Sequence, residues 1–394
     1  MGQWRSRPRH RRHRRHRATG AAGDCLACHT TRGGQPYAGG RALQTPFGAV
    51  IAPNITSDRA TGIGAWSADD FWRALHHGKA RDGRLLYPAF PYNNYTHISR
   101  DDSDALYAYF QSVPAVNQPN QPHQLRFPYN LQIALAAWRV LYFYPEVFKP
   151  EARQSAEWNR GAYLVQGLGH CSACHSARNP LGASEGEGLS GGMIPAQGWY
   201  APSLNAGAEA GLGDWQPEHI AALLKTGVSP RATVFGPMAE VVKNSLQYLN
   251  DSDIQAMAVY LKSLPADDAG KDFERSKNTE AVAFLEAGAR LYEHHCADCH
   301  GADGAGQPPG YPPLVGNRAL TMDSAVNPIR IVLNGGFAPG TAGNPRPYSM
   351  PPFGHLLNDT ETAQVVSYLR SAWGNNAPPV SGAEVNRYRA IPLD

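Results

Sequence analysis

Three copies of one short motif constrain this chain more than any other feature of its sequence. Each copy has two cysteines separated by two residues and followed at once by histidine: Cys25-Leu-Ala-Cys28-His29, Cys171-Ser-Ala-Cys174-His175 and Cys296-Ala-Asp-Cys299-His300. The chain has six cysteines, so none lies outside these motifs. C-x-x-C-H is the attachment signature of c-type haem, in which both thiols bind the porphyrin and the histidine becomes the proximal iron ligand. The sequence therefore predicts three covalently bound haem c groups.

Other uses of paired cysteines fit this spacing less well. A zinc site needs four ligands that converge from two separated pairs, whereas each pair here brings its own histidine and lies far from the next. A thioredoxin-like dithiol needs a single C-x-x-C on a βαβ unit, and a disulfide framework does not repeat one short spacing. We therefore interpret all three motifs as haem-attachment segments.

The segments around each motif recur in the same order, which indicates a threefold repeat. A leading helix is predicted before the second and third motifs, at residues 160–164 and 287–292, and only residues 19–23 stand in its place before the first. A proline-containing loop follows each motif, at residues 52–55, 201–204 and 312–315. We expect a backbone carbonyl of this loop to orient the ligating histidine ring, as such partners do in metal sites.

Each repeat is predicted to hold two more helices. Short helices end at Gly78 and Gly227, where glycine suits a left-handed cap, and Asn334-Gly335 marks the third counterpart. A closing helix follows, with Ser or Asn at its cap and acids in its first turn. The closing helices are predicted at residues 99–112, 250–264 and 358–373, with a tyrosine at one matched offset in each: Tyr109, Tyr260 and Tyr368.

These elements predict an all-α fold of three tandem class I cytochrome c-like haem domains with Gly/Pro-rich loops. The chain has 40 glycines and 32 prolines, so it forms many turns, and the porphyrin supplies apolar interior that its side chains lack. The predicted parts are a basic disordered leader (residues 1–17), a first domain (18–124), an aromatic-rich linker (125–154), a second domain (155–270), a third domain (276–380) and a tail (381–394).

Residues 1–17 hold eight arginines and no acid, and the rest of the chain is mildly acidic. We interpret this run as a disordered leader rather than a nucleic-acid arm, because no aromatic residue is interleaved with its arginines. It continues into Ala18 without the apolar stretch of an export signal. No segment approaches the roughly 18 consecutive apolar residues of a spanning helix, which excludes an integral membrane protein.

Methionine sulfur is the expected sixth ligand of two of the haems. Met350 lies eight residues before the closing-helix cap Asn358, and Met238 lies twelve before Asn250. Both are flanked by proline or glycine, which favours ligands in loops over core positions. The other candidates are in a helix core or on the wrong segments: Met257, Met193 and Met322.

The first repeat breaks this pattern. Its corresponding loop has Phe90, which cannot bind iron, nine residues before Ser99. The first haem is therefore expected to be five-coordinate, to take a histidine such as His97, or to be ligated from outside its repeat. His76 and His77 align with a helix end, and we interpret them as surface histidines.

The sequence resembles a known family, the tri-haem cytochrome c subunits of membrane-associated bacterial dehydrogenases, typified by alcohol and gluconate dehydrogenases. The likeness runs from Gly23 onward and is most specific in Thr45-Pro-Phe-Gly48, Leu86-Tyr-Pro-Ala89, Gly236-Pro-Met-Ala-Glu-Val-Val242 and Ser349-Met-Pro-Pro-Phe353. The resemblance implies a protein that accepts electrons from a periplasmic catalytic subunit carrying pyrroloquinoline quinone (PQQ), flavin or molybdopterin, and passes them to ubiquinone or a terminal oxidase. Alcohol-oxidising members usually have methionine at the position of Phe90, so this chain is more similar to the branch paired with molybdenum-containing aldehyde or N-heterocycle dehydrogenases.

The predicted function is a periplasmic electron carrier that associates peripherally with the inner membrane and has no catalytic residues of its own. The apolar, aromatic stretch at residues 125–148 is either a strap over the haem domains or a docking face for the membrane or the catalytic subunit. No nucleotide fingerprint or catalytic triad suggests substrate chemistry. The alternative is a peroxidase-like or gas-binding enzyme at an open first haem, with His76, His77 or His97 as its distal acid/base.

Overall fold

The computed structural model of this chain describes residues 22–185, 188–194, 197–207, 211–266 and 278–391. The predicted basic leader, residues 1–17, lies outside the described residues. Contacts divide the chain into two compact units. The first unit consists of Met1–Ala173, Pro180–Ala183 and Asn244–Met257, and the second of Cys174–Asn179, Ser184–Lys243 and Ala258–Asp394.

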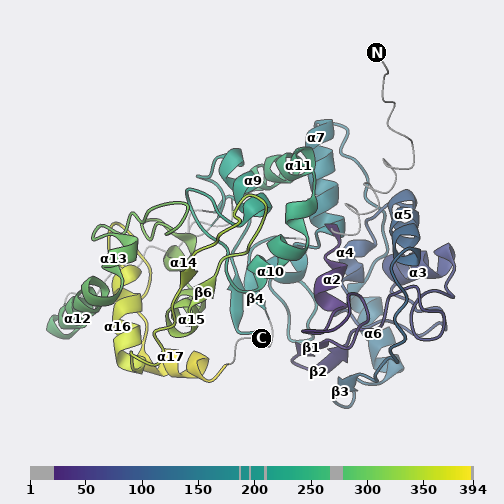
Figure 1. Cartoon of the computed structure of the whole chain (residues 1–394), viewed down its shortest axis with the longest axis horizontal. Helices are drawn as coiled ribbons and strands as arrows, with labels where there is room; N and C mark the ends of the chain where they lie inside the picture. The colour runs from purple at the N-terminus through teal and green to yellow at the C-terminus, as the bar shows by residue number, and fades with distance from the viewer. Residues whose placement is uncertain (1–21, 186–187, 195–196, 208–210, 267–277, 392–394) are drawn as a thin grey trace. The chain divides into compact units, whose positions relative to one another are not determined.

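The fold is mostly helical, as predicted, and short strands add to it (Figure 1). The elements up to the second cysteine motif are α2 (Cys25–Cys28), β1 (Ala42–Thr45), β2 (Gly48–Ile51), α3 (Ala68–His77), α4 (Tyr92–Tyr95), α5 (Arg100–Gln111), β3 (Gln124–Leu125), α6 (Gln132–Tyr142), α7 (Ala156–Tyr163) and the π-helical turn η1 (Leu164–Leu168). Strands β1, β2 and β3 form one antiparallel sheet, in which Ala42 pairs with Ile51 and Gly48 with Leu125.

The remaining helices and strands begin within the second cysteine motif. They are α8 (Ser172–His175), β4 (Gly192–Ile194), β5 (Trp199–Ala201), α9 (Pro217–Thr226), α10 (Pro237–Asn244), the 3-10 turn η2 (Leu246–Tyr248), α11 (Asp251–Lys262), α12 (Thr279–His295), α13 (Ala297–His300), α14 (Arg318–Thr321), α15 (Val326–Asn334), β6 (Gly336–Phe337), β7 (Ser349–Met350), α16 (Asp359–Leu369) and α17 (Gly382–Arg389). Strand β4 pairs with β5 and β6 with β7, both antiparallel.

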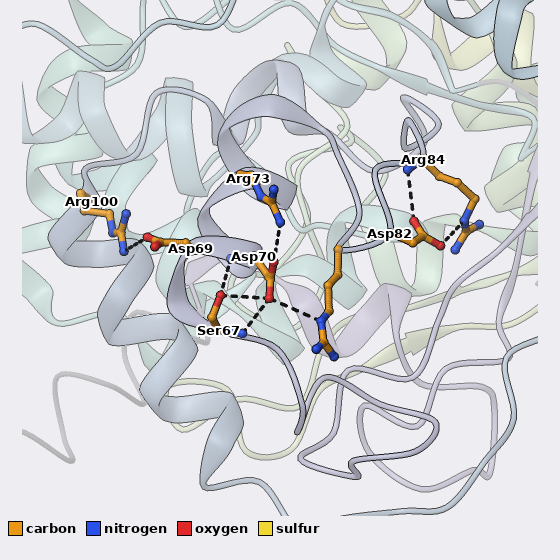
Figure 2. A network of polar contacts seen from close by, with 8 residues as sticks. Ser67, Asp69, Asp70, Arg73, Asp82, Arg84 and Arg100 are labelled. Carbon is orange, nitrogen blue, oxygen red and sulfur yellow. Dashed lines mark hydrogen bonds and ion pairs between the residues drawn. The ribbon is translucent and has the colours of Figure 1, made fainter.

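Helix α3 begins with a reciprocal capping box, which satisfies two backbone N–H groups at its start. The Ser67 hydroxyl accepts the N–H of Asp70 at 3.1 Å, and the Asp70 carboxylate accepts the N–H of Ser67 at 2.9 Å. Figure 2 shows that Asp70 also faces Arg73, at 2.5 Å, while the neighbouring Asp69 meets Arg100 of α5, at 2.7 Å. These contacts fix the N-terminal end of α3 and connect it with α5.

The helix ends follow the predicted cap residues. Helix α3 ends at Gly78, which has φ 54°, and α9 ends at Gly227, which has φ 82°, so both glycines adopt the left-handed cap conformation. The closing helices α5 and α16 begin after Ser99 and Asn358, whose side chains accept backbone N–H groups of the first turn. Local cap chemistry therefore sets these boundaries, as the sequence predicts.

The leading and closing helices of the third repeat pack against each other (Figure 1). At their contact, a Cβ on Gly288 of α12 would lie 2.7 Å from the carbonyl carbon of Gln364 and 2.9 Å from Cβ of Tyr368, both on α16. Only glycine allows the two backbones to approach this closely. The helices enclose an apolar core whose members include Tyr292, Leu320, Ile329, Val332, Leu333, Val365, Val366 and Leu369.

Helix α6 occupies the aromatic linker and is apolar on two sides. Leu135 and Phe143, which directly follows the helix, are buried, and the Arg139 guanidinium lies 5.0 Å from the ring centroid of Tyr92. One side of α6 therefore packs against the rest of the first unit. The other side is exposed and includes Ile133 (75%), Val140 (76%), Leu141 and Tyr144. Among the described residues, no helix combines the length and apolar character that crossing a membrane requires.

Candidate haem sites

Each histidine of the three motifs is held by a proline carbonyl in the loop that the sequence singles out. His29 Nδ1 lies 2.7 Å from the carbonyl oxygen of Pro53, His175 Nδ1 lies 2.7 Å from that of Pro202, and His300 Nδ1 lies 3.1 Å from that of Pro312. A carbonyl only accepts, so Nδ1 must carry the proton and donate it. This tautomer leaves Nε2 of each ring with a lone pair for a metal. The predicted orienting contact is confirmed in all three repeats.

The local electrostatics keep these rings neutral, which is the form that binds iron. Burial lowers the pKa of His29 and of His300 below the ordinary imidazole range. The pKa of His175 falls furthest, to about 4, because of burial first and because the positive charge of Arg318 lies nearby. At neutral pH all three imidazoles are therefore ready ligands without first losing a proton.

The cysteines lie on or directly before short helices. Cys25 and Cys28 are the ends of α2, one turn apart, whereas Cys171 and Cys296 directly precede α8 and α13, which contain Cys174 and Cys299. All six are free thiols. Burial raises the pKa of Cys25 to about 12 and that of Cys296 to about 11, so these thiols are neutral. Two neighbouring thiols beside an oriented imidazole are the donor set that covalent haem c requires, and the residues present fit that group.

The predicted sixth ligands occupy different settings. Met350 lies in the short strand β7 and not in the loop that the sequence predicts, and together with Cys296 it packs against the apolar core of the third repeat. Met238 lies in the first turn of α10, so the expectation that it sits in a loop is corrected: Pro237, the first residue of that helix, starts the helix instead of preventing it. Of the two candidate ligands, only Met350 has described contacts that place it in the same apolar cluster as a motif cysteine, Cys296. The ligand role of both methionines remains a prediction.

The first site differs from the other two around Phe90. The Phe90 ring lies 5.2 Å from that of Tyr95, and the Tyr95 hydroxyl donates to the carbonyl of Gly23 at 2.8 Å, two residues before Cys25. Phe90 therefore lies next to a residue that contacts the first attachment segment. This is the region that the sequence aligns with the segments of Met238 and Met350.

The interpretation of His76 as a surface histidine is wrong. Its side chain is buried, Nδ1 lies 2.8 Å from the carbonyl oxygen of Thr96, and its ring stacks on Trp72 with centroids 4.5 Å apart. His77 is half-buried. The spacing of Trp72 and His76, four residues apart on one helix face, was the signal that could have indicated packing. His97 forms backbone hydrogen bonds with Asn94 and Phe148.

Helix α4 contacts the first and the second attachment segments at once, which sequence reasoning missed. Tyr95 bonds to Gly23 before Cys25, and the adjacent Asn94 donates through Nδ2 to the Ser172 hydroxyl at 2.7 Å and to the carbonyl of Gln166 at 2.9 Å. Ser172 directly follows Cys171. Two consecutive side chains of one helical turn therefore hold the two segments together within the first unit.

A strained backbone lies at the start of the second attachment segment. The π-helical turn η1 ends at Leu168, and His170, directly before Cys171, has φ 38°, a conformation uncommon for a residue other than glycine. The His170 ring meets the Tyr95 ring edge-on, with centroids 5.6 Å apart. The same helical turn α4 thus supports both the strained residue and the hydrogen bond to Ser172.

Known proteins with similar sequences identify the family to which this chain belongs. A family model for cytochrome c matches residues 285–373. The gluconate 2-dehydrogenase cytochrome c subunit of Pantoea cypripedii is 42% identical over 376 residues, which cover 90% of this chain and 84% of that protein. This chain belongs to the family of cytochrome c subunits of bacterial dehydrogenases. The resemblance drawn from the motifs is confirmed, and membership implies covalent haem c and electron transfer within a dehydrogenase complex.

Two further relatives show how widely this cytochrome c family is used. The cytochrome c subunit of alcohol dehydrogenase (quinone) from Gluconobacter oxydans is 38% identical over 383 residues, 93% of this chain and 80% of that protein. One of the subunits of nicotinate dehydrogenase from Pseudomonas putida is 40% identical over 368 residues, which cover 92% of this chain and only 30% of that protein. Nearly the whole chain is therefore the part that the family shares.

Proposed function

We propose that this cytochrome c protein is a periplasmic tri-haem electron carrier between a dehydrogenase catalytic subunit and ubiquinone or a terminal oxidase. The observation that carries the proposal is the same histidine-to-proline contact in three repeats, each beside a C-x-x-C pair. Bound haem would supply one-electron oxidation and reduction at each site. Three domains, with boundaries near those predicted from the sequence, would each hold one haem.

The residues that would hold the haems follow from the motifs. Cys25 and Cys28, Cys171 and Cys174, and Cys296 and Cys299 would form the thioethers, and the adjacent His29, His175 and His300 would bind iron through Nε2. Met238 and Met350 would be the sixth ligands in the second and third sites. The carbonyls of the three proline loops hold the imidazole protons on Nδ1, which orients each ring and leaves Nε2 for iron.

The contacts of α4 with both attachment segments support direct electron transfer between the first two haem sites. Asn94 and Tyr95 tie Ser172, next to Cys171, and Gly23, next to the first motif, to one helical turn. Two haems attached to these segments would be held at a fixed separation, because the side chains that make both hydrogen bonds are buried and consecutive. An electron carrier needs such a fixed separation, whereas an enzyme acting at one open haem does not.

The partner is proposed to be a catalytic subunit that carries molybdenum, PQQ or flavin. The relatives named for gluconate and alcohol dehydrogenases are consistent with a sugar-acid or alcohol substrate for the complex. The relative named for nicotinate dehydrogenase, together with Phe90, favours the molybdenum-dependent branch that acts on N-heterocycles. We propose no nucleic-acid partner.

Peripheral attachment to the inner membrane is proposed through the exposed side of α6. Ile133 and Val140 lie seven residues apart on one face of the helix, and both are about three-quarters exposed. A shallow apolar face of this kind binds at a lipid surface without crossing it. In a vesicle co-sedimentation assay, Val140→Glu should reduce binding, whereas Leu356→Glu, an exposed leucine of the third repeat, should not. Equal vesicle binding by both variants would contradict the proposed membrane attachment.

The central test counts haems and examines their ligands. A pyridine haemochrome assay on exported protein should give three haems per chain, and fewer would overturn the three-site proposal. Met350→Ala and Met238→Ala should each convert one haem to a high-spin form of lower potential. Met322→Ala and Met257→Ala remove buried methionines that are proposed as core, so they should lower stability and leave the spectrum unchanged. An unaltered spectrum in Met350→Ala would refute that ligand.

A further inference from the structure

The second haem site has a cationic cluster built around one buried tryptophan. Trp215 is almost completely buried, and the guanidinium groups of Arg231 and Arg318 each lie 5.7 Å from its ring centroid. Arg231 pairs with Asp214, a carboxylate that is largely exposed. The cluster therefore combines two cations with one acid that water screens strongly.

Arg318 reaches the loop that orients the proximal histidine of this site. Its guanidinium donates to the carbonyl oxygen of Ser203, and the preceding carbonyl, that of Pro202, accepts the Nδ1 proton of His175. Arg318 comes from the start of α14, which follows the third attachment segment in the sequence. A residue of the third repeat thus places its charge beside the ligand loop of the second.

The charge of Arg318 is permanent. Burial lowers the pKa of Arg318 itself to about 10, and Asp214 opposes that shift, so the guanidinium remains protonated at neutral pH. The third site uses a neutral group at the corresponding place: the carbonyl of Pro313 accepts from the amide of Asn317 at 2.8 Å.

We infer that Arg318 is a positioning residue that raises the reduction potential of the haem attached at Cys171 and Cys174. The inference deepens the proposed function and rests on it. Reduction of a haem held by Cys171, Cys174 and His175 would add one electron, so the site would become more negative by one charge. A fixed cation in a poorly solvated position stabilises the reduced state more than the oxidised state. Its removal therefore lowers the potential of this one haem.

The test is a spectroelectrochemical titration of the full-length holoprotein, with a pair of variants that separates charge from hydrogen bonding. Arg318→Gln keeps an amide donor for the Ser203 carbonyl and removes the charge, whereas Arg318→Lys keeps the charge on a different donor. Arg318→Gln should reduce the equilibrium constant for reducing one haem by about tenfold, a downward shift of about 59 mV. Arg318→Lys should retain most of the original potential.

A third variant, at an exposed position, makes a prediction of opposite sign. Asp214→Asn removes the negative charge that offsets the two arginines, so it should raise the potential of the same haem. The rise should be smaller than the fall in Arg318→Gln, because water screens the exposed Asp214 carboxylate. Loss of one component from the titration in a Cys171→Ala/Cys174→Ala variant identifies which potential belongs to the second site.

The outcomes distinguish this inference from the proposed function. Unchanged potentials in Arg318→Gln, or an equal fall in Arg318→Lys, would overturn the charge effect while a haemochrome count of three leaves the electron-carrier proposal standing. A count below three would overturn the proposed function first. A downward shift confined to the second haem in Arg318→Gln, with an upward shift in Asp214→Asn, would establish the inference.

Discussion

Replacing Gly288 with alanine tests whether backbone contact holds the two terminal helices of the third repeat together. In an open helix, alanine is about 1 kcal/mol more favourable than glycine. Here the new Cβ would lie 2.7 Å from the carbonyl carbon of Gln364 and 2.9 Å from Cβ of Tyr368, so α12 or α16 must shift. Overpacking costs about 1–3 kcal/mol, and the upper end applies because backbone atoms cannot rotate away. The net expectation is a loss of about 2 kcal/mol in the free energy of unfolding.

Urea unfolding of the holoprotein, followed by far-UV circular dichroism, measures this loss. Gly382→Ala is the matched control, because a Cβ at Gly382 in α17 would lie 3.6 Å from Thr360 Oγ1, an ordinary contact. The control should be neutral or more stable by up to about 1 kcal/mol. If Gly288→Ala were as stable as the parent while the control behaved as expected, the close helix contact would not exist in solution.

Four further variants examine the first unit. Tyr95→Phe removes the buried hydroxyl bond to Gly23 and should shift the potential of the first haem. Tyr163→Phe breaks a half-buried bond to the Asp102 carboxylate, outside α4, and should lower stability by about 2 kcal/mol without shifting that potential. Equal potentials in both variants would argue against the role of α4. Phe90→Met should give the first haem the spectrum of a methionine-ligated haem, and an unaltered spectrum would show that the loop is misaligned. The pKa of the Asp70 carboxyl lies below its usual range because this group accepts hydrogen bonds from Ser67. The ionised carboxylate therefore stabilises the fold above about pH 4, and this stabilisation is lost as the pH falls through the pKa of Asp70 in the folded state. Asp70→Asn should therefore melt earlier than the parent at pH 7 and lose less on acidification, and parallel melting curves from pH 7 downward would contradict this.

Features set by local chemistry could be predicted from the sequence. Gly78 and Gly227 end helices and Ser99 and Asn358 begin them, because caps depend on residues within one turn. The proline carbonyls that hold the motif histidines were also predictable, because their order within the repeat is the same in all three copies. For these features, the repeat supplied independent copies of one local pattern.

Features that depend on contacts between distant segments could not be predicted. Helix α4 is one turn long and has no apolar period, so nothing marked Asn94 or Tyr95 as the connection between the first two motifs. Arg318 reaches a loop 115 residues earlier in the chain, and no motif includes it. Strand β3 pairs with β2 across many intervening residues, and its two residues are too short a segment for alternation to reveal.

The leading helix of the second repeat explains why the first two repeats cannot be separated cleanly. On α7, Tyr163 donates to the Asp102 carboxylate at 2.5 Å and accepts the N–H of Ser99 at 3.1 Å, both on the closing helix region of the first repeat. Arg160 of the same helix forms a two-bond ion pair with Asp253 of α11, at 2.7 and 3.0 Å. One helix therefore bonds to the closing helices of two repeats. Because Tyr163 holds Ser99 and Asp102 from outside the predicted first domain, a fragment that stops at residue 124 is expected to be less stable than the first repeat within the whole chain.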